Sequence, residues 1–451
     1  MSYVPNTEQN RKEMLEKIGV REFSELIGAI PDSVRLRDEL KLPPSLSEME
    51  LTKLLGERAN QSKDASQMIC FLGGGAYDHF IPAIVDHIIS RSEYYTAYTP
   101  YQAEVSQGTL QTIYEFQSLI CELTGMDVAN ASMYDGASAA AEATLLAHAH
   151  TGRDEVLVAG SLNPNYRDVL NTYCGSIKIK VRSLPLVEGL VDVEETKKKL
   201  SDKVSCVIVQ TPNFFGLLEN VGEIEPLAHS VGALVILVCD PISLGILKTP
   251  GEFNADIAVG EGQALGTNLN LGGPYLGYFA CRRSLIRRMP GRIVAATTDT
   301  RGKRGFVMTL QTREQHIRRE KATSNICTNQ ALCALSACVY LSLMGKSGIR
   351  KVAKFCLQKS HYATEQISRI DGFKKRFDAP FFKEFVIETP FSPKRIVRSL
   401  LKRNIFAGID LSRFDRKLKN HLLVCVTEKR TKEEIDHLVD ELRKLTCFKG
   451  Y

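Results

Sequence analysis

One stretch of the chain carries a carboxylate and an amide where a buried sheet could present them for chemistry. An apolar run at 233–238 predicts a buried strand that leads to Asp240, and a second short strand at 256–259 leads to Gln263. A Gly-Gly-Pro turn at 272–274 precedes a further strand. A carboxylate at a strand end can hold a protonated nitrogen, whereas an amide cannot form an imine.

This order of elements resembles the pyridoxal-phosphate enzymes of the aspartate-aminotransferase type, which share fold type I. In those enzymes the Asp keeps the pyridinium nitrogen protonated, and a Lys about two dozen positions later forms the Schiff base. Gln263 stands 23 positions after Asp240, in the place of that lysine. The chain therefore resembles a pyridoxal enzyme that lacks the residue for pyridoxal chemistry at its own site.

Gly136 and Ser138 begin an alanine-rich segment that predicts a helix. Free backbone N–H groups and the helix dipole make such a start an anion site, and in this fold the cofactor phosphate would lie there. The alternative is an ordinary capped helix. Asp240 and Ser138 match the cofactor scaffold, yet without the lysine they could serve only to stabilise their own domain.

A tyrosine-rich segment, 94–104, is the second candidate for a role in binding. Pro100 excludes a helix interior, and tyrosines on an irregular segment offer both apolar contact and hydroxyl groups, as an interface or a polar pocket requires. The alternative is a segment packed on its own domain. A glycine turn at 72–75 precedes His79, which could titrate near neutral pH or form a structural pair with Asp78. The candidates for a substrate wall or an interface are Tyr94, Tyr95, Tyr98, Thr99, Tyr101, Glu104 and His79.

The composition is that of an ordinary globular protein, 44% hydrophobic and 24% charged. No apolar run of about eighteen residues predicts a membrane span, and the start of the chain lacks the order of a secretory signal. The 12 cysteines include no CxxC pair, which favours reduced thiols in a cytoplasmic protein over a disulfide framework or a zinc site. We therefore expect no metal.

Positive charge is concentrated between residues 281 and 321, which hold twelve Lys or Arg and three Asp or Glu. Phe306 is the single aromatic residue of this stretch, and nucleic-acid binding would require more stacking partners. Two interpretations remain: a solvated helical face, or a docking surface for an acidic partner. The docking candidates are Arg313, Arg318, Arg319 and Lys321.

The periodicity along the chain predicts three parts. Residues 1–65 are expected to form a helical N-terminal arm, and residues 66–330 alternate helices with buried strands, as in a doubly wound α/β domain with a mostly parallel sheet. Residues 331–451 begin with a long connecting helix and continue as a small α+β domain. Its last helix starts with a capping box, Thr431 to Glu434.

Several longer segments together resemble one family, the P proteins of the glycine cleavage system, and within it subunit 1 of the two-subunit glycine decarboxylases. The resemblance runs from end to end. Its most specific segments are Tyr3–Thr7, Met14–Gly19, Gly73–Tyr77, Tyr98–Glu104, Tyr134–Ser138, Gly272–Gly277 and Gln311–Cys327.

The resemblance implies a division of labour between two homologous chains. A second subunit carries the Schiff-base lysine and holds pyridoxal phosphate, and this chain carries neither, in agreement with Gln263. The implied reaction is glycine dehydrogenase (decarboxylating, aminomethyl-transferring) activity: CO2 leaves glycine, and the aminomethyl group passes to the lipoyl arm of the H protein. Further implied links are to aminomethyltransferase and dihydrolipoyl dehydrogenase, with no nucleic acid and no membrane as partners.

Two other readings stay open. The chain could be a non-catalytic scaffold or regulator that only stabilises the lysine-bearing subunit. It could also be an independent pyridoxal enzyme that recruits another lysine, such as Lys248 or Lys321, although neither follows the second strand at the expected place.

Overall fold

The computed structural model describes residues 5–36, 38, 40–270 and 272–447, and the chain divides into two compact units, residues 1–63 and 64–451. The first unit contains three helices, α1 (Glu8–Ile18), α2 (Phe23–Leu26) and α3 (Glu48–Ala59), and none of its described residues is buried. Capping boxes at Thr7 and Ser47 start α1 and α3. This unit was predicted as an arm ending at residue 65.

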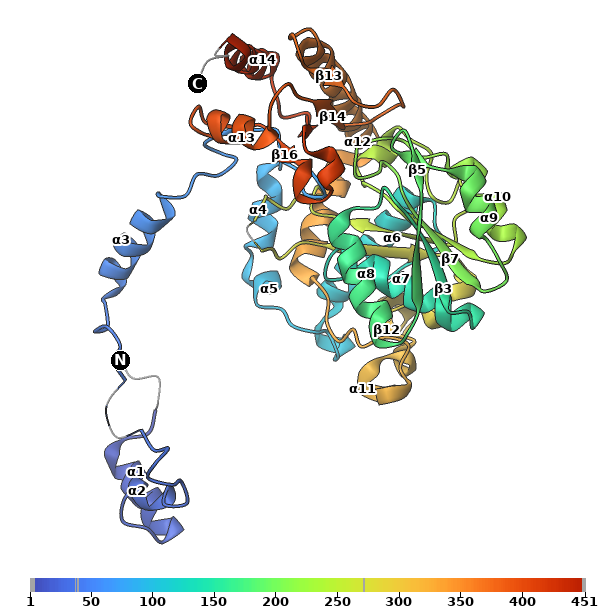
Figure 1. The fold of residues 1–451 in the computed structure, drawn as a ribbon. Helices are drawn as coiled ribbons and strands as arrows, with labels where there is room; N and C mark the ends of the chain where they lie inside the picture. The colour runs from blue at the N-terminus through green and yellow to red at the C-terminus, as the bar shows by residue number, and fades with distance from the viewer. Residues whose placement is uncertain (1–4, 37, 39, 271, 448–451) are drawn as a thin grey trace. The chain divides into compact units, whose positions relative to one another are not determined.

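A seven-stranded sheet forms the centre of the second unit (Figure 1). The pairs β4–β3, β3–β7, β7–β8 and β8–β9 are parallel, whereas β10 pairs antiparallel with both β9 and β2. In sheet order the strands are β2 (Val128–Ala129), β10 (Gly277–Cys281), β9 (Ile257–Glu261), β8 (Leu234–Val238), β7 (Val204–Gln210), β3 (Glu155–Ala159) and β4 (Lys180–Leu184). The predicted buried strands at 155–159, 204–209, 233–238 and 256–259 are all present, with ends shifted by up to two residues.

Helices cover both faces of this sheet, because its central strands are apolar on both sides. Alternate strand residues such as Val158 and Ile208 pack with α7 and α8, while Leu157 and Val207 pack with α10 on the other face. The helices of this part are α4 (Ala83–Ile89), α5 (Ser92–Tyr95), α6 (Gln107–Thr124), α7 (Gly136–Thr151), α8 (Pro164–Ser176), α9 (Val193–Lys199) and α10 (Val221–Ser230). Fold type I, with its mostly parallel sheet, is therefore confirmed.

The C-terminal part begins with α12 (Ala331–Ser368), at the residue where the connecting helix was predicted to start. Gly345 interrupts this helix with a φ of 55°. Among the described residues, α12 is the one helix that is long and apolar enough to span a membrane by length and composition alone. Tyr340 and Ala353 on it are buried in the protein core, as in the core helix of a globular protein.

A four-stranded antiparallel sheet follows α12 and packs with two helices. Its strands are β13 (Lys374–Lys375), β14 (Glu384–Glu388), β17 (His421–Cys425) and β16 (Ile409–Asp410), and its helices are α13 (Pro393–Leu401) and α14 (Lys432–Cys447). The predicted capping box is present: the Glu434 N–H donates to Thr431 Oγ1, and the Thr431 N–H donates to Glu434 Oε2. A further pairing of β1 (Ile69–Cys70) with β15 (Ile405–Phe406) ties this part to the start of the unit.

The basic stretch 281–321 is not a helical face, as one interpretation held. It forms short turns and an antiparallel hairpin of β11 (Ile293–Thr298) and β12 (Arg304–Thr309), followed by the single turn α11 (Gln315–Arg318). β11 holds four β-branched residues among its six (Ile293, Val294, Thr297 and Thr298), and Gly302 turns the chain with a φ of 78°. These local signals favour a hairpin over a helix.

Candidate functional site

A small cavity of about 30 Å³ lies at the carboxyl ends of the parallel strands β7, β8 and β9. In open α/β sheets this edge is where ligands bind. The residues that line the cavity come from the strand ends and the loop after β7, from the glycine turn, from the start of α8, and from the start of β14 and the two residues before it: Gly75, Tyr77, Asn163, Tyr166, Gln210, Pro212, Gly216, Val238, Cys239, Asp240, Glu261, Phe382, Lys383 and Glu384.

Asp240 follows β8 and is paired with a lysine from the C-terminal part. Its Oδ2 lies 2.6 Å from Lys383 Nζ, and the exposed fractions of the two side chains are 7% and 2%. The Oδ1 atom accepts a hydrogen bond from the Ile242 N–H at 3.0 Å. Burial opposes the charge of Lys383, but the attraction of Asp240 outweighs it and raises the lysine pKa. The lysine is therefore held in its charged form beside Asp240.

Lys383 was not predicted from the sequence as a site residue. Its ammonium neutralises the charge of the buried Asp240 carboxylate. The Lys383 ammonium also lies 3.5 Å from the centroid of the Tyr77 ring and 2.9 Å from His79 Nε2. A charged pair, Lys383-Glu384, within the apolar segment 381–387 was the available signal. Such residues are almost never fully buried unless they are paired.

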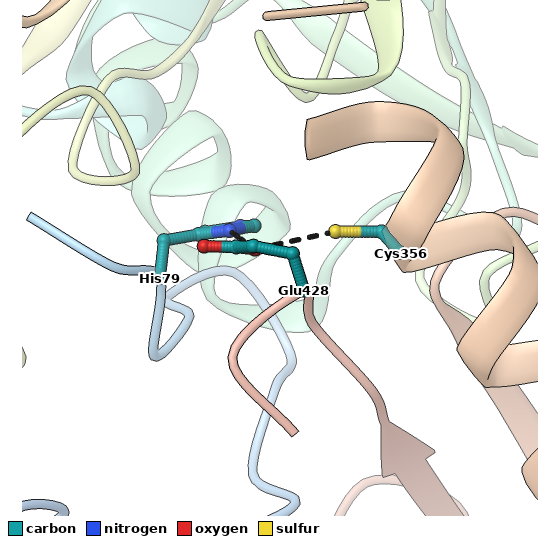
Figure 2. Close-up of side chains that lie close together, drawn as sticks. All are labelled: His79, Cys356 and Glu428. Atoms are coloured by element: carbon teal, nitrogen blue, oxygen red, sulfur yellow. Dashed lines mark hydrogen bonds and ion pairs between the residues drawn. The ribbon is translucent and has the colours of Figure 1, made fainter. Parts of the chain in front are cut away.

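His79, Cys356 and Glu428 lie side by side and could in principle hold a metal ion (Figure 2). His79 Nδ1 lies 2.6 Å from Glu428 Oε2, and the Cys356 thiol lies 3.5 Å from the same oxygen. Burial alone would raise the pKa of Glu428, but its hydrogen bonds with His79 and with the Phe80 N–H lower it to about 2. The Lys383 ammonium donates to the other ring nitrogen, Nε2, so the ring proton lies on Nδ1 and is donated to Glu428. The three side chains therefore form a hydrogen-bonded chain and not a metal centre.

His79 was a candidate for the wall of a partner's site, and the structure corrects that expectation. Its side chain is 1% exposed and is held between Glu428 and Lys383. A side chain enclosed in this way cannot reach a second subunit. His79 positions the lysine instead.

Gln263 is fixed by three hydrogen bonds and faces the interior. Its Oε1 accepts from the Tyr77 N–H at 2.8 Å, and its Nε2 donates to the carbonyls of Tyr77 (3.0 Å) and Thr267 (2.6 Å). The amide therefore links β9 to the segment after the glycine turn. A lysine has no acceptor and could not replace the bond from the Tyr77 N–H.

The start of α7 was predicted as an anion site, and the chain's own carboxyl groups lie against it. Asp135 is the N-cap and accepts from the Ser138 N–H at 2.7 Å, while the Ser138 hydroxyl donates to the Asp135 carbonyl. The Gly136 N–H donates to Glu261 Oε2 at 3.0 Å. Gly136 and Ser138 thus make their hydrogen bonds within the chain.

Glu384 joins the glycine turn to β14. One carboxyl oxygen accepts from the Gly74 N–H at 2.6 Å, and the other accepts from the Tyr77 hydroxyl at 2.8 Å. Burial raises the pKa of Glu384 to about 7. Close packing accompanies these bonds, because a Cβ at Gly73 would lie 2.2 Å from the Glu384 carboxyl oxygen.

The tyrosine-rich segment lies at a different place and is largely exposed. It borders a second cavity of about 210 Å³ with Arg292 and the start of α12. Tyr98 is 86% exposed and Tyr95 68%. Tyr101, 54% exposed, has the Arg292 guanidinium 5.8 Å from its ring centroid. From this segment Tyr94, Tyr95, Tyr98 and Thr99 line the cavity, whereas Tyr101 and Glu104 do not.

The four docking candidates separate into two groups. Arg318, Arg319 and Lys321 are exposed on α11 and the turn after it. Arg313 is different: it bonds to the Met289 carbonyl, and two of its guanidinium nitrogens are buried. Burial lowers the pKa of Arg313. Arg313 is therefore a structural residue and not part of an exposed basic surface.

Comparison with known proteins assigns the family. The family described as "Glycine cleavage system P-protein" matches residues 1–442. The chain belongs to this P-protein family. A relative in Chlorobium phaeobacteroides, "Probable glycine dehydrogenase (decarboxylating) subunit 1", is 55% identical over 447 residues, which cover 99% of this chain and 100% of the relative. A protein of the same description in Desulfitobacterium hafniense is 54% identical over 439 residues, 97% of this chain and 98% of the relative.

Solved structures agree with this assignment. The crystal structure of glycine decarboxylase (P-protein) of the glycine cleavage system, in inhibitor-bound form, matches with a TM-score of 0.91 and 40% identity, covering 99% of this chain and 100% of that chain. A NifS-like protein matches with a TM-score of 0.64 at 12% identity, covering 84% of this chain and 100% of that chain, which shows the fold alone. The predicted fold type I and the predicted family are confirmed.

The family implies pyridoxal phosphate, and the residues of this chain's own site do not fit it. The strand-end carboxylate is paired with Lys383, and Glu261 bonds to the N–H at the start of α7. The remaining cavity of about 30 Å³ has room for about one or two water molecules, and not for a ring with a phosphate group. The Schiff-base position holds an amide.

We expect Lys383→Met to destabilise the chain by about 3–5 kcal/mol, because it leaves the Asp240 carboxylate buried without its partner. Denaturant unfolding measures this change. Lys198→Met is the matched control: it breaks an exposed pair with Glu195 and should change little. The double variant Asp240→Asn, Lys383→Met should recover part of the loss, and equal losses for the single and double variants would contradict the buried pair.

Glu384→Gln should gain stability relative to the wild type as the pH rises from 5 to 8. The folded-state pKa of Glu384 is raised to about 7 from an ordinary 4.5, so the native state holds a proton that the unfolded chain has lost. Each pKa unit of difference is worth about 1.4 kcal/mol, and this contribution is lost as pH rises through 7. Unfolding free energies of both proteins at several pH values test this, and parallel pH profiles would refute the raised pKa.

Proposed function

We propose that this chain is the lysine-free subunit of a two-subunit glycine decarboxylase. The observation that carries the proposal is Gln263, which stands at the Schiff-base position and is committed to Tyr77 and Thr267 by three hydrogen bonds. Relatives that match nearly the whole chain are described as subunit 1 of glycine dehydrogenase (decarboxylating). A subunit 2 would then supply the lysine.

In this proposal pyridoxal phosphate is held by subunit 2 and supplies the electron sink for decarboxylation. The assembled enzyme releases CO2 from glycine and transfers the aminomethyl group to the lipoyl arm of the H protein. Aminomethyltransferase and dihydrolipoyl dehydrogenase would act on the products of this step. The chain itself contributes surfaces that complete the site and receive the carrier.

The tyrosine-rich segment is the proposed contact with the site on subunit 2. Tyr95 and Tyr98 are exposed beside a cavity, although aromatic side chains of this size are usually buried. Their hydroxyl groups are free to donate to a partner or to a substrate, and exposed tyrosines of this kind are enriched at protein interfaces. His79 has no part in this role.

The exposed cations after the hairpin form the proposed docking surface for the acidic carrier. Arg318, Arg319 and Lys321 lie within four residues of one another, with Glu320 as the one acidic residue among them. A concentrated positive surface accelerates association with a negatively charged partner and makes it sensitive to salt.

A scaffold that merely stabilises subunit 2 is the second candidate, and the closed interior of this chain is the observation that favours it. The two functions differ in whether residues of this chain touch the substrate. Glycine–CO2 exchange with subunit 2 and the H protein, with and without this chain, tests whether the chain is required, and the tyrosine variant below separates the two functions. Exchange that needs this chain supports the proposed heteromeric enzyme, whereas full exchange by subunit 2 and the H protein alone would overturn it.

Tyr98→Phe is expected to lower the exchange activity of the assembled enzyme by roughly fivefold, since one hydrogen bond is worth about 1 kcal/mol. Steady-state exchange at saturating glycine measures it, and the amount of complex formed should stay the same. Tyr173→Phe, on α8 and outside this cavity, is the matched control. Unchanged activity for both variants would favour the scaffold.

The double variant Arg318→Glu, Arg319→Glu should weaken binding of the H protein and reduce its dependence on salt. Titration at two ionic strengths measures both effects. The control, Lys394→Glu with Arg398→Glu, reverses two exposed cations on α13. Equal weakening by the two double variants would show a net-charge effect instead of a defined docking surface.

A further inference from the structure

We infer that this chain has replaced a bound cofactor by two of its own side chains, Lys383 at the ring end of the site and Glu261 at the phosphate end. The two side chains fill the site, and the contacts of Lys383 hold the central sheet against the C-terminal part. The inference concerns this chain's own site and does not depend on which protein completes the enzyme.

The ring end of the site is the Asp240 carboxylate. In pyridoxal enzymes of this fold, a carboxylate at this position holds the protonated ring nitrogen. Here Lys383 Nζ provides the positive charge at 2.6 Å from Oδ2. The Tyr77 ring lies against the same ammonium, with its centroid 3.5 Å from Nζ. A pyridinium would have to meet the same carboxylate, whose Oδ2 is bonded to the Lys383 ammonium and whose Oδ1 accepts from the Ile242 N–H, so the two cations compete for this position.

Lys383 is not a substitute for the missing Schiff-base lysine. The ring nitrogen and the aldehyde carbon of pyridoxal lie at opposite ends of the pyridine ring. An amine that is bonded to Asp240 is therefore at the wrong end of the ring to form an imine. The other two lysines considered from sequence, Lys248 and Lys321, do not line this cavity.

The phosphate end of the site is the start of α7. Glu261 Oε2 accepts from the Gly136 N–H at 3.0 Å, and Oε1 accepts from the N–H groups of Leu276 at 3.0 Å and Gln263 at 3.1 Å. The Gly136 N–H is a donor that an anion at this helix start would use, and the N–H groups of Gln263 and Leu276 hold the Glu261 carboxyl group in place. The Tyr166 hydroxyl also lies close to the start of α7, since a Cβ built at Gly136 would lie 2.0 Å from it. Little space is therefore left beside Gly136 for another group.

The same side chains hold two parts of the unit together. Lys383 and Glu384 come from the start of β14, while their partners Asp240 and Tyr77 come from the central sheet and the glycine turn. His79 and Glu428 extend the contact on the far side of the lysine. Where a pyridoxal enzyme of this fold would bind its cofactor, this chain has a direct contact between the central sheet and the C-terminal part.

The test is cofactor binding by the full-length chain, followed by absorbance, equilibrium dialysis and borohydride reduction with peptide mapping. Pyridoxal phosphate probes the whole site, and pyridoxine phosphate probes the ring and phosphate positions without an aldehyde. We expect neither the wild type nor Gln263→Lys to bind either compound stoichiometrically. The triple variant Gln263→Lys, Lys383→Met, Glu261→Ala retains Asp240 and should bind pyridoxal phosphate, with a reduced adduct at position 263.

Stoichiometric binding by Gln263→Lys alone would overturn the inference, because the two filled ends would then be no obstacle. A folded triple variant that binds neither compound would overturn it as well. Should the triple variant fail to fold, acetylation of lysines in the wild-type chain tests the inference instead. Lys383 should be among the slowest lysines to react, because it is buried against Asp240. Rapid acetylation of Lys383 would contradict the inference. Cofactor binding by the wild type would overturn this inference and leave the heteromeric function intact, since exchange with subunit 2 is measured separately.

Discussion

The ion pair between Lys383 and Asp240 fixes the arrangement of the interior around it. Two charges removed from water are tolerated only when they are close and further hydrogen-bonded, and the neighbours meet that requirement. The Lys383 ammonium can only donate, and His79 Nε2 accepts its hydrogen bond. The other ring nitrogen of His79, Nδ1, therefore faces Glu428. The Tyr77 ring lies against the same ammonium, and its hydroxyl bonds to Glu384. The glycine turn must therefore pass close to β14, and glycine at 73 leaves the space for it.

The same constraint separates the fold from the chemistry usually found in it. The sheet edge, the strand-end Asp and the helix start of a pyridoxal enzyme are all retained, and each has a partner within the chain. Among the described residues, the tyrosine-rich segment and the cations that follow the hairpin are exposed to other molecules. Under the proposed function, the partner subunit holds the reactive group and this chain contributes contacts from outside.

Local patterns in the sequence were sufficient for most elements of the central sheet. Continuous apolar runs marked β3, β7, β8 and β9, and the capping box at Thr431 marked the start of α14. The absence of a lysine at 263 was also visible directly. The identity of the residue that neutralises Asp240 was not, because Lys383 is far away in the sequence and periodicity carries no information about which segments meet. The burial of Arg313 and His79 was hidden for the same reason, whereas the hairpin at 293–309 could have been recognised from its β-branched residues and its glycine turn.

If the second site is filled by the protein itself, the working enzyme has one cofactor site for each pair of subunits. The most direct measurement is the amount of pyridoxal phosphate released from the purified two-subunit complex, compared with the amount of each chain. We expect one cofactor per pair of chains, with all of the borohydride-fixed label on the partner subunit. Two cofactors per pair, or label on this chain, would contradict it.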